Sequence, residues 1–269
     1  MNKSKLTRTS SLTLVGALGL LTLSSVAASS HSNGMLDETD MVGVSFWLAT
    51  AMMLASTVFF ILERNNVAAK WKTSMTVAAL VTGIAWYHYT YMREHWVETG
   101  TSPLVMRYID WLITVPLQVS EFYLILAAIG AASAVLFWKL FGASIVMLVA
   151  GFLSESSIDA VDGMETPLFA IGVLAWLYII YELWAGEAKE KVSDASEGTQ
   201  FAFKAMAGIL TVGWAIYPLG WLMGQDATQD AIDNLNILYN IADVVNKTAF
   251  GMMVWYAATM DTKASSSEE

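Results

Sequence analysis

Seven apolar stretches follow one another along the chain, each near the length needed to cross a membrane. They cover residues 41–62, 71–92, 103–126, 132–153, 167–184, 201–223 and 232–260, with short connections. A spanning helix needs about 20 apolar residues. Charged residues make up only 14% of the chain, against about 25% in a soluble domain. The pattern predicts an all-α membrane protein, a seven-transmembrane-helix bundle over residues 41–260.

The composition excludes several classes of function. The chain has no cysteine, which rules out disulfides, thiol catalysis and cysteine metal sites. His31, His88 and His95 are too scattered for a cluster of metal ligands. A net charge of −10 argues against binding to nucleic acid.

Residues 1–28 have the parts of a secretory signal peptide. Lys3, Lys5 and Arg8 precede a short apolar core over residues 12–26, and small residues follow. The alternative is an extra transmembrane helix, although the core is short for one. Cleavage would leave residues 29–40 as an extracellular segment. Residues 261–269 are polar and are predicted to form a disordered cytoplasmic tail.

The charges near the segment ends predict the orientation. One side carries eight cations, whereas the other carries Arg93 and many carboxylates. Because positive loops stay inside, we expect the N-terminus outside and the C-terminus in the cytoplasm. The eight cations are Arg64, Lys70, Lys72, Lys139, Lys189, Lys191, Lys204 and Lys263.

The last apolar segment contains Asp243 and Lys247 near its middle. Residues four apart share one face of a helix, about one turn apart. Charge in hydrocarbon is costly, so such residues usually mark a working site. A buried lysine can also form a Schiff base with a carbonyl compound. The alternative is a structural ion pair between packed helices.

A polar stripe runs along segment 103–126. Arg107, Asp110, Thr114, Gln118 and Glu121 recur at intervals of three or four, so they share one helix face. Such a stripe should face the bundle interior. Asp110 and Glu121 are about 16 Å apart along the axis. Two carboxyl groups stacked in this way suit a proton relay, and the alternative is polar contact between helices.

Segment 201–223 contains an aromatic stripe. Trp214, Tyr217 and Trp221 lie on one face, and Pro218 is expected to kink the helix. Taken alone, such a stripe is more often packing than a binding site. His88, late in segment 71–92, is by itself more typical of a packing or interface residue than of a switch.

These motifs together resemble the microbial (type 1) rhodopsins and, in detail, the proteorhodopsins, over residues 41–258. Matching stretches occur in separate segments, including Val44 to Trp47, Glu121 to Leu126 and Tyr181 to Gly186. The central motifs are Arg107-x2-Asp110-Trp111-x2-Thr114-x-Pro116, Trp214-x2-Tyr217-Pro218 and Asp243-x3-Lys247.

The resemblance implies a role for each charged residue. Lys247 would bind all-trans retinal as a protonated Schiff base. Asp110 would be the primary counterion and proton acceptor, and Asp243 the second counterion. Glu121 would be the proton donor on the cytoplasmic side, and Arg107 would tune both counterions. A cationic Schiff base in a medium of low dielectric constant needs such compensating charge.

The resemblance also implies which residues surround the chromophore. Tyr89 would hydrogen-bond near Asp243, and Thr114 near Asp110. Five residues would enclose the polyene and three would lie toward the ring. These are Trp111, Trp214, Tyr217, Pro218 and Trp221, and then Met147, Gly151 and Trp176.

Partners are implied as well. His88 would pair with Asp110 and reach a neighbouring protomer near Trp47, in a homo-pentamer or hexamer embedded in membrane lipid. Phe169 occupies a position where antenna-binding relatives have glycine, so no carotenoid is expected there.

The implied function is a light-driven outward proton pump, not an enzyme, in the bacterial inner (plasma) membrane. Asp110, Thr114 and Glu121 match proton pumps rather than chloride or sodium pumps. The alternative is a slow-cycling sensory rhodopsin that signals through a partner. An ordinary seven-helix receptor or transporter would leave the motifs unexplained. Gln118 predicts blue absorption, since this position resembles a tuning switch; alternatively, it only hydrogen-bonds within the bundle.

Overall fold

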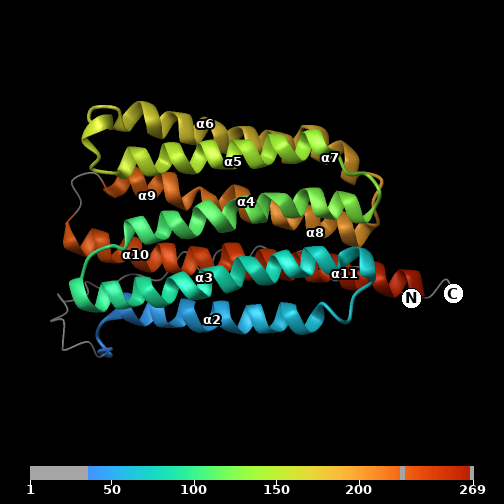
Figure 1. The fold of residues 1–269 in the computed structure, drawn as a ribbon, viewed down its shortest axis with the longest axis horizontal. Coiled ribbons are helices and arrows are strands. Elements are labelled where there is room, and N and C mark those ends of the chain that lie inside the picture. The colour runs from blue at the N-terminus through green and yellow to red at the C-terminus, as the bar shows by residue number, and fades with distance from the viewer. Residues whose placement is uncertain (1–35, 225–227, 267–269) are drawn as a thin grey trace, which may run out of the picture.

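The structure is a computed structural model that describes residues 36–224 and 228–266. Seven helical rods pack side by side, and no strand occurs among these described residues (Figure 1). The predicted signal peptide, and residues 29–35 of the predicted extracellular segment, lie outside the described part of the chain. The fold is therefore the predicted seven-helix bundle.

Five rods are single helices, and the last two are each interrupted by a π-helical turn. The single helices are α2 (Met41–Glu63), α3 (Lys72–Thr99), α4 (Leu104–Ala128), α5 (Ala134–Glu155) and α6 (Glu165–Trp184). The sixth rod joins α8 (Glu197–Gly208), η3 (Ile209–Gly213) and α9 (Ile216–Gly224). The seventh joins α10 (Gln229–Val244), η4 (Val245–Ala249) and α11 (Phe250–Ser266). Short turns η1 (Ala69–Trp71) and η2 (Asp159–Val161) and helix α7 (Glu187–Val192) lie in the connections.

Local sequence signals set where the helices begin and end. Asp40 caps α2 by accepting the backbone N–H of Gly43 at 2.8 Å, and Ser133 caps α5 in the same way. Helix α3 continues to Thr99, beyond the predicted end at residue 92. It stops where Gly100 adopts a left-handed conformation with φ of 64°.

The end of the last rod differs from the prediction. We expected residues 261–269 to be disordered, but α11 continues through Ser266. Asp261 accepts a hydrogen bond from Nε1 of Trp71 at 2.8 Å and pairs with Nζ of Lys70 at 2.7 Å. These contacts fix the helix against the α2–α3 connection, so at least residues 261–266 are ordered.

The rods form a closed ring around an interior that contains polar side chains. Neighbours in sequence pack on one another, and α10 packs on α2 to close the ring. Five helices in the described part of the chain are long and apolar enough to cross a membrane. Helix α3 and the α10–α11 rod are not among these five, and both contain charged residues within their length. The start of α2 and the end of α11 lie at opposite ends of the bundle (Figure 1).

Candidate functional site

Lys247 lies in the middle of the bundle, within the π-helical turn η4. Its side chain is 2% exposed, and its Nζ atom lies 3.1 Å from Oδ2 of Asp110 and 3.1 Å from Oδ2 of Asp243. The structure therefore brings together the two carboxylates predicted from separate segments. Both carboxylates lie close enough to the buried amine for a proton to pass directly between the amine and either of them.

Three side chains hold Asp243 in place. The hydroxyl of Tyr89 donates to Oδ2 at 2.7 Å, and that of Tyr217 donates to Oδ1 at 2.5 Å. Nε1 of Trp111 lies 3.3 Å from both carboxylate oxygens. Hydrogen bonds of this kind stabilise a carboxylate in its ionised form.

Asp110 has fewer donors. Its Oδ1 lies 3.2 Å from Nδ1 of His88, and its Oδ2 lies 3.4 Å from the hydroxyl of Thr114. The Thr114 hydroxyl also lies 3.0 Å from the backbone carbonyl of Asp110. The predicted pairings of Asp110 with His88 and Thr114 are thus both present in the structure. Asp110 is therefore held by fewer and longer hydrogen bonds than Asp243, although both carboxylates face Lys247.

Arg107 is buried, but its hydrogen bonds go to neutral groups. Its Nη2 atom donates to Oδ1 of Asn236 at 3.0 Å and to Oδ1 of Asn240 at 2.8 Å. Nη1 lies 3.5 Å from the hydroxyl of Tyr89. Arg107 therefore reaches Asp243 through Tyr89.

The two asparagines were missed by the sequence analysis. They share a helix face with Asp243, at the three- and four-residue spacing that marked the stripe on α4. The same periodicity that marked the stripe on α4 therefore also identifies Asn236 and Asn240.

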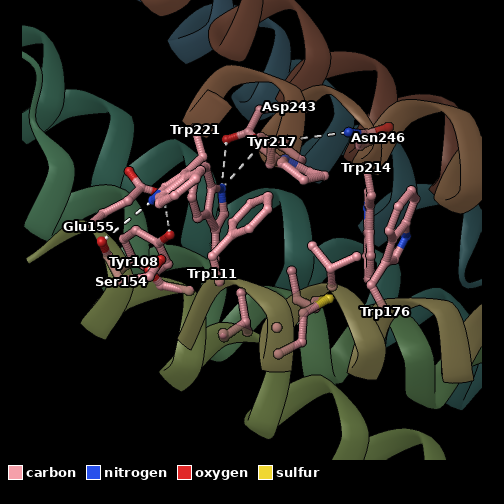
Figure 2. Close-up of a pocket in the computed structure, with 18 of the residues that line it drawn as sticks. Tyr108, Trp111, Ser154, Glu155, Trp176, Trp214, Tyr217, Trp221, Asp243 and Asn246 are labelled. Carbon is pink, nitrogen blue, oxygen red and sulfur yellow. Dashed lines mark hydrogen bonds between the residues drawn. The ribbon is translucent and has the colours of Figure 1, made fainter. Parts of the chain in front are cut away.

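An aromatic cavity extends from Lys247 between α4, α5, α6 and α9 (Figure 2). A Cβ atom on Gly172 would lie 3.2 Å from the backbone oxygen of Met147, and one on Gly151 would lie 3.2 Å from the hydroxyl of Tyr108. A side chain at Gly151 would therefore press on Tyr108 in the cavity wall, and one at Gly172 would press on the backbone of α5. The predicted residues that line it are Trp111, Gln118, Met147, Gly151, Trp176, Trp214, Tyr217, Pro218, Trp221 and Lys247.

Other lining residues, among them Tyr108 and Glu155, were not predicted from the sequence. The hydroxyl of Tyr108 donates to Oε1 of Glu155 at 2.6 Å. The ring of Phe169 stacks on Trp221 with 4.1 Å between centroids and 13° between planes. Phe169 thus forms part of the wall beside α9.

Gln118 lines the cavity and is also hydrogen-bonded within the bundle. Its Nε2 atom donates to the backbone carbonyl of Asn246 at 2.6 Å. The two interpretations left open by the sequence are therefore compatible. Nothing in the sequence predicted this partner, because it depends on the π-helical turn η4.

Glu121 lies further along α4, away from this cavity. It is 1% exposed, and neither carboxylate oxygen has a hydrogen-bond partner among the described residues. Ser74 Oγ is likewise buried and unpartnered in that part of the chain. Glu121 is therefore a buried carboxyl group that is not among the residues lining the cavity.

Trp47 lies on the outer surface of α2 and is 45% exposed. The guanidinium carbon of Arg93 lies 3.7 Å from the centre of its ring, which is a cation–π contact. His88 lies on α3 with a side chain 16% exposed, so it reaches from Asp110 toward the outside of the bundle.

The chain is similar to known proteins of one family. Residues 40–260 match the family described as bacteriorhodopsin-like protein. The blue-light absorbing proteorhodopsin of Gamma-proteobacterium Hot 75m4 is 52% identical, over 92% of this chain and 99% of that protein. The green-light absorbing proteorhodopsin of Gamma-proteobacterium EBAC31A08 is 53% identical, over 90% and 98%.

Solved structures show the same fold. The crystal structure of blue light-absorbing proteorhodopsin from Med12 has 52% identity and a TM-score of 0.67, and covers 82% of this chain and 98% of that one. Xanthorhodopsin, a light-driven ion pump with dual chromophore, has 28% identity and a TM-score of 0.77, over 86% and 98%. Fold and site together define a seven-helix membrane protein with a buried lysine between two carboxylates. The chain belongs to the bacteriorhodopsin-like family, and among the relatives compared it is most similar to the proteorhodopsins.

Proposed function

We propose that this chain is a light-driven outward proton pump of the bacterial plasma membrane that binds all-trans retinal through Lys247 and absorbs blue light. The observation that carries the proposal is the buried amine of Lys247 between Asp110 and Asp243. A third buried carboxyl, Glu121, lies further along α4. The names of the proteorhodopsin relatives, which describe light absorption, support it.

The cavity fits a polyene. It is lined by aromatic rings and begins at Lys247, and Gly151 leaves room beside Tyr108 in its wall. Retinal joined to Nζ of Lys247 supplies light absorption and an isomerisation that moves the protonated nitrogen. Apolar walls with few polar groups suit such a ligand. Trp111, Trp214 and Tyr217 would hold it in one orientation.

The two carboxylates beside Lys247 would have different roles. Asp243 accepts hydrogen bonds from Tyr89, Tyr217 and Trp111, which favour its staying an anion. Asp110 has fewer donors and lies equally close to Nζ, so we assign it as the proton acceptor. His88 would orient Asp110 from the outer side.

The order of the carboxyl groups along α4 would set the direction of proton transport. Glu121 is about 16 Å from Asp110 along the helix axis, on the side away from Arg107. An ionised carboxyl without partners is costly in a buried site, so Glu121 is suited to carry a proton and give it up. Asp110 would take a proton from the Lys247 nitrogen and pass it outward, Glu121 would return a proton to that nitrogen, and Glu121 would be reprotonated from the cytoplasm, which gives net transport.

The orientation follows the loop charges. The end of the bundle with Lys70 and Lys263 would face the cytoplasm, and the end with Asp159, Asp162 and Glu165 would face outward. The N-terminus would then be outside and the C-terminus inside. In a homo-pentamer or hexamer, His88 and Trp47 would lie near the protomer interface, because both reach the outer surface of the bundle.

A sensory role is the second candidate, since sensory rhodopsin-2 of Natronomonas pharaonis is 30% identical over 81% of this chain and 90% of that protein. Sensory relatives usually lack a carboxyl at the position of Glu121, so its presence favours the pump.

The test uses cells that express the full chain and are supplied with all-trans retinal. In light, they should acidify an unbuffered medium, and a protonophore should abolish the signal. Lys247→Ala, as the control, should form no pigment. Acidification that survives the protonophore, alkalinisation that it enhances, or a visible pigment in Lys247→Ala would contradict the proposal.

A further inference from the structure

The two π-helical turns meet beside Lys247. Turn η3 ends at Gly213, and turn η4 holds Asn246 directly before Lys247. The side chain of Asn246 is buried and fills the space that Gly213 leaves. A Cβ atom on Gly213 would overlap Oδ1 of Asn246 and lie 2.8 Å from its Cγ. A larger residue at 213 must therefore displace Asn246.

Asn246 is also tied to two other rods. Its backbone carbonyl accepts from Nε2 of Gln118 at 2.6 Å. Its Nδ2 donates to the hydroxyl of Tyr217 at 3.3 Å (Figure 2). On the other side of Lys247, the hydroxyl of Thr248 lies 2.8 Å from that of Ser56. Both chain neighbours of Lys247 are thus hydrogen-bonded to other helices, and Asn246 in addition packs closely against Gly213.

We infer that Asn246 is a positioning residue for Lys247, and that Gly213 provides the notch that makes this position possible. A long lysine side chain has many rotamers, so the direction of Nζ depends on how its backbone is held. Displacing Asn246 would move that backbone and lengthen the contacts of Nζ with Asp110 and Asp243. The inference rests on the proposed attachment of retinal to Lys247.

The expected effect on colour has a definite sign. Counterions that lie farther from the cationic nitrogen stabilise the ground state less, so the absorption should move to longer wavelength. Loss of the hydrogen bond between Gln118 and the Asn246 carbonyl would also move the absorption to longer wavelength. In the apoprotein, Lys247 with weaker ion pairs should react faster with formaldehyde and cyanoborohydride.

The test is a double-mutant cycle with Gly213→Ala and Asn246→Ala. Gly208→Ala is the matched control, because it lies on the same rod and a Cβ there meets nothing within 4 Å. Two quantities are measured: the absorption maximum with retinal, and the methylation rate of Lys247 without retinal, from mass spectrometry of its peptide. Gly213→Ala should shift the maximum to longer wavelength and raise the methylation rate several-fold. In the Asn246→Ala background it should have no further effect, because the amide that it overlaps is gone.

Two results would overturn the inference. One is a Gly213→Ala effect no larger than that of Gly208→Ala. The other is an equal effect in both backgrounds. If Gly213→Ala alone does not fold, the double variant provides the test. The inference is supported if the double variant folds with the absorption maximum and methylation rate of Asn246→Ala. It is overturned if the double variant also fails to fold. A pigment in Lys247→Ala would instead refute the proposed function, and the methylation rates would still test the positioning role.

Discussion

Gln118 donates its side-chain N–H to the peptide carbonyl of Asn246, the residue directly before Lys247, at 2.6 Å. The amide therefore joins α4 to the π-helical turn that carries the lysine. A polar group at this point lies close to the end of the cavity where positive charge is concentrated before excitation. This relationship gives the colour prediction a structural basis.

Gln118→Leu should shift the absorption to longer wavelength without abolishing pumping. Leucine has a similar size but no dipole, so it cannot favour the ground-state charge distribution. The absorption maxima of the two proteins are compared over a range of alkaline pH, so that a change in the charge of Asp110 does not mimic the shift. An unchanged maximum would defeat the tuning assignment and leave the pump assignment in place.

Asp110→Asn should stop proton transport and also shift the absorption to longer wavelength. The substitution removes an anion 3.1 Å from Nζ of Lys247, and with it the acceptor. Light-induced acidification and the absorption spectrum are measured together. Asp110→Glu, which retains a carboxylate, is the matched control and should keep part of the activity. Normal pumping by the asparagine variant would exclude Asp110 as the acceptor.

Glu121→Gln should leave the colour nearly unchanged and slow the recovery of the pigment after a flash. The residue lies about three turns from Asp110, too far to act on the chromophore's charge directly. A membrane-permeant weak acid such as azide should restore the recovery rate, because it supplies the missing proton. A large change in colour with normal recovery would contradict the donor role.

Asp261→Ala should destabilise the bundle by about 1–2 kcal/mol, because it removes a hydrogen bond to Trp71 and a partner of Lys70. The absorption maximum should not change, since the contact is far from Lys247 along α11. Asp261→Asn retains an acceptor for the hydrogen bond from Trp71, so it should destabilise the bundle less than Asp261→Ala. Denaturation in increasing SDS, followed by the loss of visible absorption, measures the difference. Equal stability of all three proteins would show that the contact contributes nothing.

Much of the fold could be predicted because the length of an apolar segment and the helical spacing of its polar residues are both visible within that segment. The seven segments and the faces of Asp110 and Lys247 follow from spacing alone. The resemblance predicted contacts that spacing alone does not, such as the pairing of His88 with Asp110. The structure places these two side chains in contact.

Other features depend on tertiary contacts and had no signal in single segments. The π-helical turns place Asn246 against Gly213 and turn its carbonyl toward Gln118. The order of residues 261–266 depends on Asp261 meeting a loop almost 200 positions earlier in the chain. Periodicity within one segment carries no information about either arrangement.

The surroundings of Arg107 have a consequence for leakage. Its guanidinium donates to the neutral amides of Asn236 and Asn240, and its positive charge also acts on the carboxylates of Asp243 and Glu155. It lines a second cavity, on the side of the bundle with Glu155 and Asp159. A fixed cation at such a point raises an electrostatic barrier to other cations, as an arginine does in a water channel. In the proposed pump, protons that enter from that side would meet this barrier before they reach Asp110, and it would oppose flow in the reverse direction.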